Sequence, residues 1–219
     1  MPPIVSIVGR SKSGKTTLIE KLLAELTGRG YQIATIKHTY RDINLDEPGK
    51  DSWRHIRAGS HSTILSSPGK VVLIKPVREE ITPGELARLL GEECDLIITE
   101  GFKQGDAPKI EVHRREVGPT LNDIKKLIAI ASDEPLESKV RQFSLEDIKG
   151  LADLLEKGMI IPQLERASLY INNVPTPLST FPKEFITNTL LGMVSSLKGV
   201  GEVKSLDIFL RRGTKGEGQ

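Results

Sequence analysis

The residues with the clearest chemical meaning lie near the amino terminus, where two glycines precede a lysine and two threonines. The segment Gly9-Arg-Ser-Lys-Ser-Gly-Lys-Thr-Thr17 matches the phosphate-binding pattern G-x-x-x-x-G-K-[ST], called a P-loop. Glycines let backbone N–H groups converge on phosphate oxygens, and the N-terminus of a following helix adds positive potential. We therefore expect nucleotide phosphates to be bound by Gly9, Ser11, Lys12, Ser13, Gly14, Lys15, Thr16 and Thr17.

Two side chains of this loop have distinct expected roles. Lys15 would neutralise the β- and γ-phosphates and is our first candidate catalytic residue. The hydroxyl of Thr16 would ligate Mg²⁺, which supplements the small protein charge against a highly charged triphosphate. The predicted cofactors are therefore a nucleoside triphosphate and Mg²⁺.

A second candidate group follows the apolar run 96–99. Glu100 ends this run and is predicted to hold Mg²⁺, directly or through water, and to act as the second catalytic residue. Gly101 would let the chain pass close to the γ-phosphate. Asp95 begins the same run, roughly 16 Å away along an extended strand, so both acids cannot serve one ion. By itself Glu100 would be an ordinary strand-end carboxylate, and the P-loop favours the metal-binding interpretation.

Asp133, which follows the run 128–132, is our candidate residue for binding the base of the nucleotide. A carboxylate at this place accepts hydrogen bonds from the N1–H and the exocyclic amine of guanine, a donor pair that adenine lacks. The usual guanine signature Asn-Lys-x-Asp is absent from the sequence. Asp133 serves equally well as a turn residue before Pro135, so the preference for guanine stays open at this point.

The polar segment 37–52 concentrates ionisable groups. Its acids include Asp46, which we predict as a further Mg²⁺ ligand. A transition-metal site is an alternative, but the spacing of its candidate ligands fits no compact template: His38, Asp42, Asp46, His55 and His61. We favour a phosphate-responsive switch loop or a docking surface for an anionic ligand.

The elements that must position these residues begin with a buried strand at 4–8, the glycine loop, and an amphipathic helix over 15–29. This order is typical of an α/β domain of the P-loop NTPase class, with three layers and a mostly parallel sheet. Residues 38–60 are predicted as a long loop. Further strands are expected at 32–37, 63–66, 71–74, 96–99, 109–113 and 127–131, and helices at 82–90 and 144–157.

The pattern changes after Gly158. Strands at 168–172 and 203–210 and a helix at 182–198 predict a small C-terminal α+β unit. We therefore expect a P-loop nucleotide-binding domain at 1–158, an accessory domain at 160–212, and a disordered tail at 213–219. A unit of this size is rarely stable by itself without a disulfide or a bound metal. We therefore expect it to pack against the first domain or a second subunit.

Composition excludes several functions. The 219 residues include 31 basic and 29 acidic side chains, and a net charge of +2 argues against a nucleic-acid partner held by bulk charge. No apolar run approaches a membrane span, and the start lacks a signal sequence, so a cytoplasmic protein without a membrane partner is expected. Cys94 is the only cysteine, which excludes an intramolecular disulfide and CxxC zinc motifs.

Six short motifs in this order resemble the molybdopterin-guanine dinucleotide biosynthesis protein B (MobB) family. They occur at 9–17, 36–39, 48–52, 58–59, 100–103 and 131–135. The resemblance covers residues 3–157. It implies a homodimeric P-loop fold that binds GTP and Mg²⁺ and hydrolyses GTP slowly. It also implies that Lys15 and Thr16 bind phosphate and metal, that Glu100 lies near the metal, and that Asp133 reads the base.

The resemblance further implies partners. The family assists a MobA-like guanylyltransferase that attaches GMP to molybdopterin, giving the guanine dinucleotide cofactor. Residues 160–219 go beyond the shorter family members, so they are expected to handle the cofactor or to bind a partner.

Three other functions are alternatives to this interpretation. A small-molecule kinase would use the same P-loop, with Glu100 as the acceptor base. A nickel-insertion GTPase usually carries Cys or His ligands near its switch, and the single cysteine counts against it. A non-catalytic adaptor would bind GTP and deliver a cofactor, and the turnover rate separates it from a slow GTPase.

Overall fold

The computed structural model describes residues 1–41, 43, 46–163, 167–172 and 174–210. Two compact units make up the chain, Met1–Arg166 and Ala167–Gln219. All the residues predicted to bind nucleotide belong to the first unit. The predicted tail at 213–219 lies outside the described residues, and the predicted domain boundaries stay a prediction.

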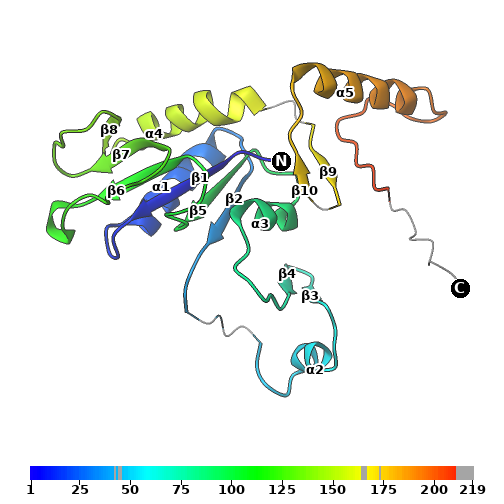
Figure 1. The fold of residues 1–219 in the computed structure, drawn as a ribbon, viewed down its shortest axis with the longest axis horizontal. Coiled ribbons are helices and arrows are strands. Elements are labelled where there is room, and N and C mark those ends of the chain that lie inside the picture. Colours follow the sequence, from blue (N-terminus) through cyan, green and yellow to red (C-terminus); the bar gives the residue numbers. More distant parts are fainter. Residues whose placement is uncertain (42, 44–45, 164–166, 173, 211–219) are drawn as a thin grey trace, which may run out of the picture. The chain divides into compact units, whose positions relative to one another are not determined.

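The first unit is built on a six-stranded parallel sheet in the order β2-β5-β1-β6-β7-β8 (Figure 1). Parallel strands place their carboxyl ends at one edge, and the register pairs Gly9 with Val112 and His113 with Ser132. The predicted α/β fold with a mostly parallel sheet is confirmed. The strands are β1 (Ile4–Gly9), β2 (Ile33–Lys37), β5 (Leu96–Glu100), β6 (Lys109–His113), β7 (Leu127–Ser132) and β8 (Arg141–Ser144).

One face of this sheet forms the apolar core. Helices α1 (Lys15–Gly28) and α4 (Ile148–Leu155) bury their apolar stripes there against alternate residues of the central strands. The chain continues from α4 through a π-helical turn, η2 (Glu156–Ile160), and a short 3₁₀ turn, η3 (Ile161–Gln163). Ile160 is buried in the same core, so any separation of the two parts of the chain must follow this residue.

The opposite face is polar over its centre. Ser6, Thr99, Lys109, Glu111 and His113 are all buried there, and the hydroxyl of Thr99 donates to that of Ser6 at 2.8 Å. Helix α3 (Pro83–Leu90) covers the β2 end of this face and begins with a capping box formed by Thr82 and Glu85. The buried polar groups therefore lie beneath the loops that follow β5 and β6.

The segment between β2 and α3 contains more structure than predicted. Helix α2 (Asp51–Arg57) interrupts the expected long loop, and β3 (Thr63–Ser67) pairs antiparallel with β4 (Lys70–Ile74) as a hairpin. A seven-residue helix with one buried side chain has too little apolar periodicity to be recognised in the sequence. The two predicted strands of the hairpin are confirmed.

The predicted helix start at Ser144 is wrong. Ser144 is the last residue of β8, a strand that the sequence analysis missed, and Asp147 is the N-cap of α4. The Asp147 side chain accepts a hydrogen bond from the N–H of Gly150 at 3.0 Å. Strand β8 has four residues and one buried side chain, so it lacks a readable pattern.

The second unit contains an antiparallel pair, β9 (Leu169–Ile171) and β10 (Val174–Thr176), and helix α5 (Thr180–Ser195). The small α+β unit is confirmed, but the predicted strand at 203–210 is wrong, because no strand is assigned over those described residues. A strand needs a partner for its backbone groups, and β9 pairs with β10 instead. Among all the described residues, no helix has the length and apolar character needed to cross a membrane.

Candidate nucleotide site

The P-loop connects the end of β1 to the start of α1. Gly9 has φ +152°, and a Cβ there would lie 2.5 Å from the carbonyl oxygen of Val112, so only glycine fits. Gly14 has φ +92° and is the N-cap of α1, and no side chain caps the helix at this position. The first turn of α1 also has no acidic residue. The N–H groups of this turn are therefore available to an anion.

Lys15 folds back over the loop. Its Nζ donates to the carbonyl oxygen of Arg10 at 2.7 Å. Burial lowers the pKa of Lys15, the nearby carboxylate of Glu100 opposes this shift, and the charges of Lys103 and Lys37 add to it. A cation placed in this way is stabilised by an arriving anion, as the predicted phosphate contact requires.

The structure brings Thr16 and Glu100 together from the helix and the neighbouring strand. The Thr16 hydroxyl lies 3.1 Å from both carboxylate oxygens of Glu100. Lys37 lies opposite Glu100 in the register of β2 and β5, with its Nζ 3.4 Å from Oε2. A hydroxyl and a carboxylate are hard oxygen donors of the kind that Mg²⁺ prefers, so this pair fits the predicted ion. The contact of Lys37 with Glu100 was missed by the sequence analysis.

Gly101 connects this pair to the end of β2. Its φ is +107°, and a Cβ would lie 3.2 Å from the Cβ of His38. The ring of His38 stacks at a tilt on Phe102, with centroids 4.4 Å apart, and its Nε2 lies 2.8 Å from Glu80. The turn at Gly101 is therefore packed against His38, which in turn contacts Glu80 in the segment before α3.

Asp133 lies at the end of β7, two strands away from the P-loop strand. Its Oδ1 accepts a hydrogen bond from the backbone N–H of Arg115 at 3.0 Å, and its Oδ2 lies 4.0 Å from Nη1 of Arg114. The carboxylate is partly exposed. Asp133 thus makes a structural contact and also has an exposed carboxylate surface. Both the turn role and the base-binding role remain compatible with its position.

Arg114 is the main functional candidate that the sequence analysis missed. It directly follows β6, and its Nε donates to the carbonyl oxygen of Ser13 at 3.2 Å. The guanidinium lies over Gly14, where a Cβ would be 3.3 Å from Nε. In the sequence, the only indication of its role was its position directly after a buried strand. That position becomes informative only when the order of the strands in the sheet is known.

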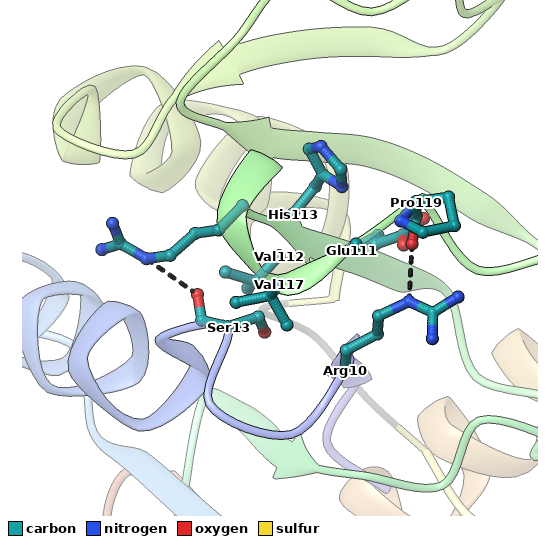
Figure 2. A pocket seen from close by; sticks show the side chains of 9 residues that line it. Arg10, Ser13, Glu111, Val112, His113, Val117 and Pro119 are labelled. Carbon is teal, nitrogen blue, oxygen red and sulfur yellow. Dashed lines mark hydrogen bonds between the residues drawn. The ribbon is translucent and has the colours of Figure 1, made fainter.

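Beneath the loop, a polar hollow separates the P-loop from β6. Figure 2 shows it, with dashed lines joining Arg10 to Pro119 and Ser13 to the arginine opposite. The Ser13 hydroxyl is buried there with no hydrogen-bond partner among the described residues, and the hollow encloses no water-sized space. The backbone N–H of Ser13 donates to the carbonyl oxygen of Arg10 at 3.3 Å, so the backbone holds Ser13 within the loop while its hydroxyl is enclosed beneath it.

Glu111 lies in the same hollow. Its Oε1 accepts a hydrogen bond from the N–H of Leu121 at 2.6 Å, and burial raises its pKa. Its Oε2 is buried with no partner among the described residues. Glu111 therefore supports the loop that follows β6 from below.

The remaining predicted residues are less closely placed. Ser11, Lys12 and Thr17 are exposed on the loop and the first turn, and Lys12 has φ +65°. Asp46 accepts a hydrogen bond from the Ser52 hydroxyl at 2.7 Å, which ties its carboxylate to the start of α2. Asp42 lies outside the described residues. Within the described part of the chain, no three His, Cys, Asp or Glu side chains gather as metal ligands.

Comparison with known proteins agrees with this geometry. Residues 4–133 match the family described as Molybdopterin guanine dinucleotide synthesis protein B. The chain is 38% identical over 162 residues to the molybdopterin-guanine dinucleotide biosynthesis adapter protein of Haemophilus influenzae, covering 72% of this chain and 89% of that protein. The crystal structure of Bacillus subtilis MobB gives a TM-score of 0.56 at 28% identity, over 72% of this chain and 98% of that one.

A relative from Methanocaldococcus jannaschii extends the similarity. It is 26% identical over 237 residues, covering 94% of this chain and 96% of that protein. So long an alignment reaches well into the second unit. The C-terminal part is therefore shared with at least one relative.

Proposed function

Because the chain belongs to the molybdopterin-guanine dinucleotide biosynthesis protein B family, we propose that it binds GTP and Mg²⁺ and assists the formation of molybdopterin guanine dinucleotide. The nucleotide would lie along the carboxyl edge of the sheet, with its phosphates on the P-loop. The relatives' description as adapter proteins supports an accessory role rather than a synthetic one.

The observation that carries this proposal is the contact of the Thr16 hydroxyl with both oxygens of Glu100. These two residues would hold Mg²⁺, which supplies positive charge to the β- and γ-phosphate oxygens. Lys15 would exchange its bond to the Arg10 carbonyl for phosphate oxygens. Lys37 shares the Glu100 carboxylate and balances its charge.

Guanine would be selected by Asp133, whose outer oxygen lies free of the Arg115 hydrogen bond. The strand order supports this assignment, because β6 alone separates β7 from the P-loop strand. Slow hydrolysis, with Lys15 and Glu100 as the catalytic residues, is part of the proposal.

The proposed partners are a MobA-like guanylyltransferase, molybdopterin and a second copy of the chain. The names of the relatives support a molybdopterin-related role. Exposed apolar side chains on the β3–β4 hairpin support the homodimer. The non-catalytic adaptor remains the second candidate, because the adapter description of the relatives requires no turnover.

The test is equilibrium binding of GTP and ATP with and without Mg²⁺, for the wild type and Lys15→Ala. We expect GTP to bind better than ATP, Mg²⁺ to strengthen binding, and Lys15→Ala to abolish it, since the loop then lacks the lysine that would neutralise the β- and γ-phosphates. The fold should survive, because burying this charged lysine costs folding free energy.

Lys21→Ala on the outer part of α1 is the matched control and should bind GTP normally. Undiminished GTP affinity in Lys15→Ala would disprove the site. Phosphate release without any partner separates a slow GTPase from an adaptor, and phosphorylation of added molybdopterin would favour the kinase alternative.

A further inference from the structure

The strand order dictates which part of the protein lies beneath the middle of a bound nucleotide. The P-loop follows β1 and Asp133 follows β7, and β6 lies between these two strands. A nucleotide with its β- and γ-phosphates on the P-loop and its base on Asp133 must therefore cross the carboxyl end of β6. The first residue after β6 is Arg114.

The side chain of Arg114 is held by the P-loop on one side and lies near Asp133 on the other. Its Nε–H is held by the Ser13 carbonyl of the P-loop, and its Nη1 lies 4.0 Å from Asp133, beyond hydrogen-bond distance. The terminal nitrogens are therefore the donors left for a ligand, and the side chain is partly exposed. A planar guanidinium suits phosphate oxygens and also packs flat against rings.

We propose that Arg114 is a nucleotide-binding residue that contacts the α-phosphate and ribose, and so connects the phosphate loop to the base-reading carboxylate. This inference rests on the nucleotide binding proposed above. It assigns to Arg114 the one portion of the nucleotide that Lys15, Thr16, Glu100 and Asp133 leave without a partner.

A purely structural role is the competing explanation, because the hydrogen bond to Ser13 also supports the P-loop. The two roles differ in which nucleotides they affect. Support of the loop matters for ligands that place a β-phosphate on it, such as GTP and GDP. A contact with the α-phosphate matters equally for GMP, which has no β-phosphate.

Equilibrium dialysis of radiolabelled GTP, GDP and GMP tests the difference. We expect Arg114→Ala to weaken all three by a similar factor, roughly 10- to 100-fold, as for the loss of a charge-assisted hydrogen bond. Lys15→Ala should weaken GTP and GDP and spare GMP. Arg115→Ala is the matched control, because its exposed side chain belongs to the same loop and its backbone N–H to Asp133 is retained.

A second variant keeps the result informative if Arg114→Ala fails to fold. Arg114→Gln retains a donor for the Ser13 carbonyl but lacks the charge, and it should weaken all three nucleotides while melting like the wild type. Loss of GTP and GDP binding with GMP unaffected would overturn the inference in favour of loop support. Wild-type protein that binds GTP but not millimolar GMP would also overturn it. Wild-type protein that binds no GTP would overturn the proposed function itself.

Discussion

The central strands of the sheet and the β3–β4 hairpin have similar apolar sequences but opposite environments. Ile98 of β5 is 0% exposed, whereas Ile64, Val71 and Leu73 of the hairpin are 63%, 66% and 41% exposed. These three hairpin residues share one face, because Ile64 pairs with Leu73 and side chains alternate along a strand. The sheet is buried by the layers around it, and the hairpin is uncovered within one chain.

This difference shows that an apolar pattern predicts a strand but not what covers it. A two-stranded hairpin is marginally stable by itself in water. The hairpin contacts α2 but contributes no residue to either apolar core. In the proposed homodimer, a second copy of the chain would cover this apolar face.

The largest expected effect sharpens the comparison directly. Ile98→Ala should lower the free energy of unfolding by about 2–5 kcal/mol, because it leaves a cavity in a fully packed core. Ile64→Ala, the same change on the hairpin, should cost less than about 1 kcal/mol in the monomer, since the side chain is already largely in water. Urea unfolding of both variants at low protein concentration measures the difference. Equal losses would mean that the hairpin is covered in the monomer.

The next effect concerns the functional edge of the buried sheet. Asp133→Asn should weaken GTP by about 1.5–3 kcal/mol, through loss of a charge-assisted pair with guanine. Xanthosine triphosphate should bind better, because the amide can donate to the extra carbonyl of xanthine. Asparagine can still accept the hydrogen bond from Arg115, so the fold is preserved. Equal weakening of both nucleotides, measured by calorimetry, would leave Asp133 with a structural role alone.

A smaller effect follows from the buried charge at this edge. Burial lowers the pKa of Lys15 below the ordinary 10.5, and bound phosphate would raise it again. GTP binding should therefore take up a proton in alkaline solution, and affinity should fall by at most about tenfold per pH unit above the lowered pKa. Below that pKa this lysine contributes no pH dependence. Lys15→Arg, which stays charged, should lose the alkaline decline; a decline that persists would have another origin.

The smallest expected change in stability is on the hairpin. Val71→Glu should alter the unfolding of the monomer by no more than about 0.5 kcal/mol, as is usual for an exposed site. In sedimentation it should convert dimer to monomer, because a charge would be buried at the interface. Lys70→Glu, on the neighbouring residue and the opposite face, is the control. A dimer that survives Val71→Glu would place the interface elsewhere.

The sequence predicted those parts of the fold and site that depend on local pattern. The P-loop glycines, the apolar stripe of α1 and the central strands are of this kind, and Glu100, singled out at the end of its strand, lies beside Thr16. Arg114 could not be found, because its importance comes from the lateral order of β1, β6 and β7. The predicted strand at 203–210 failed because alternation specifies a strand only where a partner edge is available.

The residues of the proposed site are far apart in the sequence, and this has a consequence for protein synthesis. The strands that end at the site are parallel, so strands that are adjacent in the sheet are separated by long stretches of sequence. The pairing of β1 with β5, for example, brings distant residues together. A nascent chain that has exposed Gly9–Thr17 has no partner yet for that loop, because Glu100 and Asp133 are synthesised much later. The P-loop can therefore form a complete nucleotide site only after most of the sheet has been synthesised. Binding of GTP to ribosome-bound chains of increasing length would show at which length the site is complete.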